Sequence, residues 1–123
     1  MISLMDNSHA DAGIPIEDQY PKLVRDKIPE IVEATGKIAA VRAMLDDDEY
    51  QEFLYKKLVE EATELSSAEG EDRQKEEMAD VMEVFEAILV LKGLSKSDVA
   101  SVQAQKRDKR GGFIKRLLML EKP

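Results

Sequence analysis

Cysteine and tryptophan are absent from the 123-residue chain, and histidine occurs once, at position 9. Without cysteine the chain has no disulfide, thiolate zinc site, iron–sulfur cluster or cysteine nucleophile. A single histidine near the amino terminus also argues against a histidine-rich metal site or a histidine-based catalytic triad within one chain. The spare histidine and missing cysteine together argue against zinc.

Long apolar runs are also missing, and no stretch reaches the length of a transmembrane helix. The opening residues, MISLMDNSHADAG, lack the basic region of a secretory signal peptide and include an early aspartate. We therefore expect a soluble, cytoplasmic protein without a membrane partner. The chain has 26 acidic and 18 basic residues, a formal net charge of -8, and this balance argues against a nucleic-acid partner.

Apolar residues make up 43% of the chain and charged residues 36%, which is enough for one domain with a modest core. Residues 1–19 are small, polar and aperiodic, and they predict a flexible leader or a loosely docked arm. Residues 20–123 form the predicted domain.

Apolar periodicity and capping residues predict a mainly helical chain. The expected helices cover residues 26–34, 46–67, 73–91 and 95–109. Residues 37–45 are either a short strand or a connection, and residues 113–120 either a strand or a last helical turn. The two long helices, joined by a short loop, predict an antiparallel hairpin within an all-α bundle that contains at most a small β element.

Each long helix carries two carboxylates on its apolar side. Leu54 and Leu58 lie within about 60° of Glu61 on a helical wheel, and Glu64 follows one turn later. On the second helix, Val84 lies within about 20° of Glu77, and Asp80 follows one turn later.

Four carboxylates on facing sides of a hairpin repel one another, so either their pKa values rise or a cation offsets their charge. The four are Glu61, Glu64, Glu77 and Asp80. All-oxygen ligation favours Mg²⁺ or Mn²⁺. The alternative is a structural ion-pair network with Lys57 or Arg73. Other acidic side chains are expected on solvated faces: Glu60, Glu76, Glu83 and Glu86.

The same carboxylates form a pattern, EExxE at residues 60–64 and ExxD at 77–80. This pattern resembles the signature of the MazG-like all-α nucleotide pyrophosphohydrolases. The flanking blocks are similar to a phosphoribosyl-ATP pyrophosphohydrolase-like subgroup. These blocks are KLVRDKIPEIVEATG at 22–36, DDEYQEFLYKKLVEEATEL at 47–65, EEMADVMEVFEAI at 76–88 and KRDKRGGF at 106–113.

The resemblance covers about residues 20–120 and implies a homodimer or homotetramer. It also implies Mg²⁺-dependent hydrolysis of a nucleoside triphosphate to the monophosphate and pyrophosphate, clearing noncanonical or excess nucleotides. It makes Glu61, Glu64, Glu77 and Asp80 metal ligands, with Glu60 and Glu61 the candidate catalytic residues. Hydrolysis of phosphoribosyl-ATP in histidine biosynthesis is an alternative, and a non-catalytic, cation-binding helical module is a rival from another class.

Basic residues are needed to bind the triphosphate. Lys106, Arg107 and Arg110 precede two glycines that permit close approach of the backbone to a phosphate. The alternative for this segment is a helix carboxyl end that favours basic residues because of its dipole.

Further substrate-binding candidates are Lys57, which faces the carboxylates on the wheel, and the pair Arg25 and Lys27, for which a surface role is the alternative. Three aromatic residues are candidates to stack on a base: Tyr50, Phe53 and Tyr55. The stripe formed by Met78, Met82 and Phe85 is expected to belong to the core or to a subunit interface.

Overall fold

A computed structural model describes residues 13–44 and 46–123 of the chain. Its elements are η1 (Ile16–Asp18), a short 3₁₀ helix, and the α-helices α2 (Ile28–Glu33), α3 (Asp47–Ser67), α4 (Glu71–Lys92) and α5 (Lys96–Arg110). The all-α prediction is confirmed, since the described ranges contain no strand. None of the helices in these ranges combines the length and apolar character that a membrane span requires.

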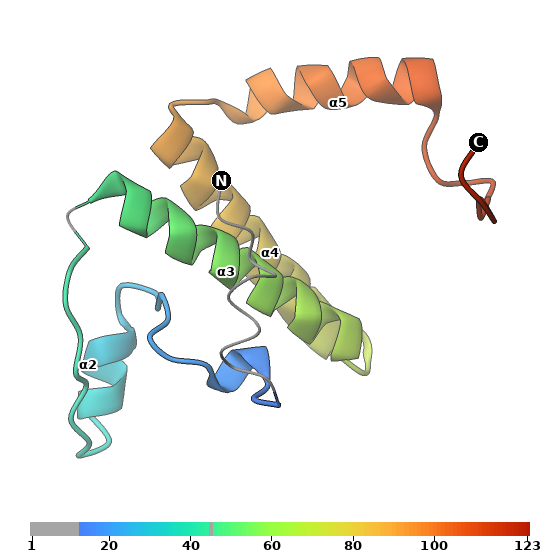
Figure 1. The fold of residues 1–123 in the computed structure, drawn as a ribbon. Helices are drawn as coiled ribbons and strands as arrows, with labels where there is room; N and C mark the ends of the chain where they lie inside the picture. Colours follow the sequence, from blue (N-terminus) through green and yellow to red (C-terminus); the bar gives the residue numbers. More distant parts are fainter. Residues whose placement is uncertain (1–12, 45) are drawn as a thin grey trace.

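The antiparallel hairpin of α3 and α4 is the centre of the structure (Figure 1). The side chain of Asp46 accepts a hydrogen bond from the backbone N–H of Asp48 and so caps the start of α3. At the far end α4 stops at Gly93, whose φ of 67° is left-handed and suits a residue without a Cβ atom. Both long helices therefore begin and end within two residues of their predicted limits.

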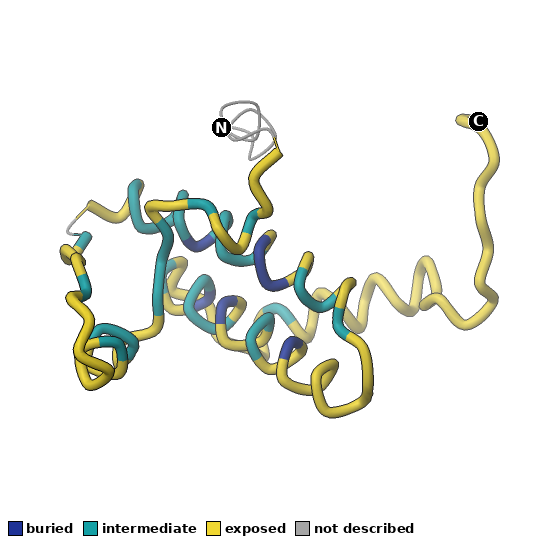
Figure 2. Tube along the Cα trace, turned by 90° about the horizontal axis from the view of Figure 1, so that it is seen from below, coloured by how far each residue is buried: buried dark blue, intermediate teal, exposed yellow. Residues whose placement is uncertain are grey.

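The core of the hairpin is small and unusually charged. The buried apolar side chains are those of Leu54, Val84 and Leu89. Three carboxylates are equally buried, those of Glu60, Glu61 and Glu77. Among the described residues, the buried positions lie on α3 and α4 (Figure 2). Burial of these carboxylates costs free energy unless a hydrogen bond, a proton or a cation offsets their charge.

The amino-terminal part of the described chain lies against the hairpin. η1 contacts α3, so residues 16–18 of the predicted flexible leader are docked on the long helix, while residues 1–12 lie outside the described residues. The next predicted helix is found as α2, with Pro29 in its first turn as expected. Residues 37–44 have no regular secondary structure, so this segment is a connection.

The carboxyl-terminal part extends away from the hairpin (Figure 1). α5 begins with the predicted capping box, in which Ser95 and Asp98 exchange hydrogen bonds, and none of its residues is buried. The expectation of a strand or helical turn over residues 113–120 is wrong, because this segment contains only a turn at 114–115. Its apolar side chains are exposed, Phe113 to 97%, so nothing in the single chain stabilises a regular element there.

Candidate metal centre

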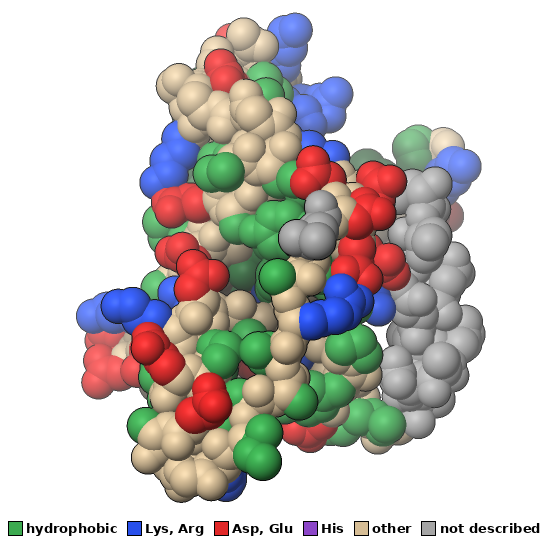
Figure 3. All heavy atoms as spheres, turned by 90° about the vertical axis from the view of Figure 1, so that its left-hand side faces the viewer, with side chains coloured by type: hydrophobic (Ala, Val, Ile, Leu, Met, Phe, Trp, Pro, Cys, Tyr) green, Lys and Arg blue, Asp and Glu red, His purple; other side chains and the backbone are tan. Residues whose placement is uncertain are grey.

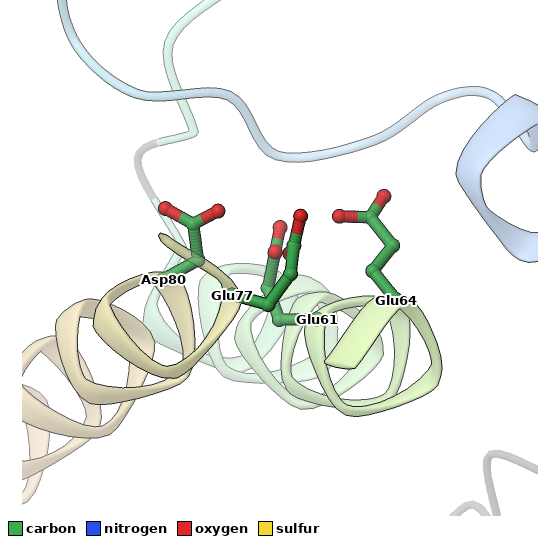
Figure 4. A group of neighbouring side chains, drawn as sticks. All are labelled: Glu61, Glu64, Glu77 and Asp80. Atoms are coloured by element: carbon green, nitrogen blue, oxygen red, sulfur yellow. The ribbon is translucent and has the colours of Figure 1, made fainter. Parts of the chain in front are cut away.

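Four carboxylates from the two long helices meet at one place on the hairpin (Figure 4). α3 supplies Glu61 and Glu64, and α4 supplies Glu77 and Asp80. One oxygen atom from each residue can be chosen so that all four atoms lie within 4.8 Å of one another. The three-residue spacing places each pair on one helix face, and the antiparallel packing brings the pairs together.

Two of these residues are buried without enough hydrogen-bond partners. Glu61 is 5% exposed and Glu77 is 6% exposed. In each, the buried Oε2 atom accepts no hydrogen bond from any described residue. A buried carboxylate oxygen without a donor or cation is destabilising. A cation among the four side chains would satisfy both atoms, and all four donors are the hard oxygen ligands that Mg²⁺ and Mn²⁺ prefer.

Burial and the charges of neighbouring carboxylates raise the pKa values of two residues of the cluster. Burial, the charge of Glu61 and the proximity of Glu77 raise the pKa of Glu64 from 4.5 to about 7. Burial also raises the pKa of Glu61, as does the charge of Asp80, although the neighbouring Lys57 opposes the shift. A cation bound among these carboxylates would therefore compete with a proton near neutral pH.

Three basic residues contact the edge of the cluster. The Arg25 guanidinium lies 2.6 Å from Asp80 Oδ1, and Arg73 lies 3.4 Å from Glu77 Oε1. Lys57 Nζ lies 2.9 Å from Glu60 Oε2 and 3.4 Å from Glu61 Oε1. The ion pairs expected under the structural alternative are thus present, but they leave the buried Oε2 atoms of Glu61 and Glu77 without a partner among the described residues.

The sequence-based expectation that the Glu60 side chain is solvated is wrong. It is 5% exposed, and its carboxylate accepts a hydrogen bond from Lys57. The wheel considered only the packing of α3 on α4, whereas η1 also contacts α3. Glu76 and Glu83 are exposed, as expected, and Glu86 is partly exposed and pairs with Lys96.

Lys57 contacts both buried glutamates of α3, Glu60 and Glu61. Burial alone would lower its pKa, but the hydrogen bond to Glu60 and the charges of Glu60 and Glu61 raise the pKa above its usual value. Lys57 is therefore a permanent cation beside the cluster at neutral pH. This position agrees with the wheel, which placed Lys57 toward the carboxylates.

A cavity of about 440 Å³ adjoins the carboxylates. Its floor is formed by α3 and α4, and its other wall by residues 23–27. Residues 23–27 belong to the pale blue chain that crosses the open side of the carboxylates in Figure 4. Arg25 and Lys27 both line the cavity, so these two predicted substrate-binding residues lie beside the cluster. Sequence reasoning missed the apolar residues Leu23 and Val24, which carry no signal of their own.

The remaining predicted phosphate-binding residues are not brought to the cluster within one chain. Lys106, Arg107 and Arg110 are exposed near the end of α5, which leads away from the hairpin (Figure 1). These residues lie at the carboxyl end of a helix. The alternative, in which basic side chains interact favourably with the helix dipole, requires the same position.

The surface carries mixed charge. Acidic and basic side chains are interspersed on the face seen from the left-hand side of Figure 1, and apolar side chains are exposed between them (Figure 3). The clustering of four carboxylates with a cavity at their side therefore distinguishes the candidate centre from the charged surface around it.

Comparison with known proteins gives one partial match to report. No family model matches the chain, and no solved structure matches it. An uncharacterized protein of Mycolicibacterium smegmatis is 47% identical over 51 residues, which is 42% of this chain and 51% of the relative. The chain thus spans about half the length of that relative.

Proposed function

We propose that the protein is a metal-dependent nucleoside triphosphate pyrophosphohydrolase that uses Mg²⁺, or Mn²⁺ in its place. The observation that carries the proposal is the pair of buried, unpartnered carboxylate oxygens of Glu61 and Glu77 inside a four-carboxylate cluster. The resemblance of the EExxE and ExxD pattern to the MazG-like enzymes supports the choice of reaction.

The four carboxylates would hold the ion through one oxygen each: Glu61, Glu64, Glu77 and Asp80. When bound, such an ion polarises a phosphoryl oxygen and makes water more acidic. Arg25 and Lys57 lie beside the cluster and are assigned to the phosphate oxygens, which they can meet through charge-assisted hydrogen bonds. Binding of the substrate would then exchange the Arg25–Asp80 contact for an Arg25–phosphate contact.

The reaction is hydrolysis of one phosphoanhydride bond. Water adds to the α-phosphorus, the bond from that phosphorus to the bridging oxygen breaks, and pyrophosphate leaves with the electron pair. Glu60 and Glu61 are assigned to orient the water and accept its proton. Lys57 donates a hydrogen bond to Glu60 Oε2 over 2.9 Å and so fixes the position of that carboxylate.

We also propose that the chain works as a homodimer or homotetramer. Part of the α4 surface is apolar and exposed, with Met78, Met82 and Phe85 each at least 40% exposed. The tail after α5 adds further exposed apolar side chains from Phe113 to Leu120. Patches of this kind are typical of protein–protein contacts.

Pyrophosphate release over a panel of nucleotides, including phosphoribosyl-ATP, tests the proposal. It is measured with Mg²⁺, with EDTA, and with the variants Glu77→Gln and Glu76→Gln. Glu76 is the matched control, because it is the neighbouring residue on α4 but its side chain is 72% exposed.

We expect metal-dependent release by the wild type and by Glu76→Gln, and at least about a hundredfold loss in Glu77→Gln. A preference for phosphoribosyl-ATP would assign the histidine-pathway activity instead. Absence of release from every nucleotide, with Mg²⁺ shown to bind, would favour the non-catalytic cation-binding module.

A further inference from the structure

The cavity beside the carboxylates shares two residues with them. Glu61 and Asp80 line the cavity and also belong to the four-carboxylate cluster. The cavity volume of about 440 Å³ is within the range of small-molecule sites. A ligand whose charged end meets the cluster therefore has room for its remaining part in this cavity.

The walls of the cavity are mainly apolar. Leu23 and Val24 lie on one side, and Leu54, Val84 and Ala87 lie on the hairpin side. Tyr50 also lines it, whereas Phe53 and Tyr55, the other two aromatic candidates, do not. Apolar walls with one aromatic ring suit a flat heterocycle, which stacks on an aromatic side chain through its face.

Besides Glu61 and Asp80, two further carboxylates line the cavity. Asp26 and Glu83 line it, and neither makes a side-chain hydrogen bond or ion pair with another residue in the described ranges. An ionised carboxylate only accepts hydrogen bonds. Cytosine, adenine and guanine each offer an exocyclic amino donor, whereas uracil and thymine offer one imide N–H between two carbonyl oxygens that a carboxylate repels.

We propose that this cavity binds the nucleobase of the substrate and that Asp26 and Glu83 select amino-bearing bases over uracil and thymine. The inference rests on the proposed function for the position of the phosphates. The inference adds to that function the class of base that the substrate carries and the residues that select this class. Lys27, which also lines the cavity, supplies a donor for a ring nitrogen or carbonyl of the same base.

The first test compares kcat/KM for dCTP, dATP and dGTP with the values for dUTP and dTTP. We expect the best amino-bearing substrate to exceed both diketo pyrimidines by at least about tenfold, the factor that one charge-assisted hydrogen bond provides. Glu83→Gln and Asp26→Asn keep the shape but add a donor that can meet a carbonyl. At least one of them should reduce the preference about tenfold, mainly by improving dUTP hydrolysis.

Glu76→Gln is the matched control, since it removes one exposed charge from α4 at a position that does not line the cavity. It should leave the ratio of the kcat/KM values unchanged. Equal hydrolysis of amino-bearing and diketo substrates, or a preference that neither Asp26→Asn nor Glu83→Gln alters, would overturn the inference and leave the pyrophosphohydrolase proposal standing.

A binding measurement separates the two proposals. Isothermal titration calorimetry in Mg²⁺ compares CMP, AMP and GMP with UMP and TMP, and it requires no turnover. Binding of an amino-bearing monophosphate that is weakened by Glu83→Gln or Asp26→Asn supports the inference even if no triphosphate is hydrolysed. Failure of every monophosphate to bind, or equal binding of all five, would overturn it.

Discussion

Replacing Glu77 with glutamine should stabilise the metal-free protein and remove its response to Mg²⁺. Two unit charges 4.8 Å apart, the outer limit of the cluster, repel by about 3.5 kcal/mol at an effective dielectric constant of about 20. Four ionised groups form six such pairs, about 20 kcal/mol in all, which exceeds the stability of a typical domain. The metal-free site is therefore expected to hold a proton below about pH 7, in line with the pKa of Glu64, which burial and the neighbouring carboxylates raise to about 7.

The expected gain is smaller than the pairwise repulsion. Arg25, Lys57 and Arg73 already offset part of the negative charge, and glutamine at position 77 forfeits the contact with Arg73. We therefore expect the free energy of unfolding to rise by about 1–3 kcal/mol at about pH 8 without metal. For a chain of this length the midpoint of thermal unfolding rises by about 4 °C for each kcal/mol.

Mg²⁺ should raise the free energy of unfolding of the wild type more than that of Glu77→Gln. A ligand that binds only the folded state at one hundred times its Kd stabilises that state by about 2.7 kcal/mol. The wild type should gain this stability, and Glu77→Gln should gain almost none, because it lacks one of the four carboxylates. Magnesium would thus reverse the order of stability expected in EDTA.

The assay is urea denaturation followed by far-ultraviolet circular dichroism, in EDTA and in saturating Mg²⁺. Glu76→Gln is again the control, and its stability should be almost unchanged in both buffers, as is usual for an exposed position. Two results would refute the reasoning: a loss of stability in Glu77→Gln without metal, or an equal gain from Mg²⁺ in wild type and variant.

Three further predictions concern stability. Because the pKa of Glu64 is raised from 4.5 to about 7, the folded state binds more protons than the unfolded state between these values, so the unfolding free energy in EDTA should fall as pH rises through this window. Urea denaturation at a series of pH values should show this slope, and Glu64→Gln should flatten it. Lys57→Met leaves two buried glutamates without their shared cation and should cost about 2 kcal/mol in the same assay, whereas no loss would show that the ion pair is dispensable. Leu54→Ala, at a side chain 1% exposed, should cost about 3 kcal/mol by urea or thermal denaturation, and a loss below about 1 kcal/mol would contradict the assignment of the core.

The hairpin and the meeting of the four carboxylates followed from local rules. Helix limits at Asp46 and Gly93 depend on capping chemistry that neighbouring residues determine. Once two helices are joined by a three-residue connection, antiparallel packing is almost imposed. The helical period then places Glu61 and Glu77 toward each other, and this prediction needs no long-range information.

The cavity and the ion pairs beside it could not be predicted from these local rules. Arg25 and Asp80 are 55 residues apart in sequence, and no periodicity predicts which turn of α4 the segment of residues 23–27 will cross. The prediction that Glu60 is exposed was wrong for a similar reason. The helical wheel described only the packing of α3 on α4, whereas α3 also contacts η1. Such contacts depend on tertiary packing, which a single amphipathic pattern does not encode.

The composition of the core connects stability with the proposed chemistry. Leu54, Val84 and Leu89 are the buried apolar side chains of the described residues, and three buried glutamates lie beside them. Uncharged replacements at Glu61 and Glu77 would relieve the repulsion within the cluster but would remove two of the ligands that a divalent ion needs. Sequence positions that reduce stability in this way are typical of binding and catalytic sites. The metal-free hairpin is therefore expected to be the less stable form, and binding of a cation among the carboxylates would complete its core as well as the proposed active site.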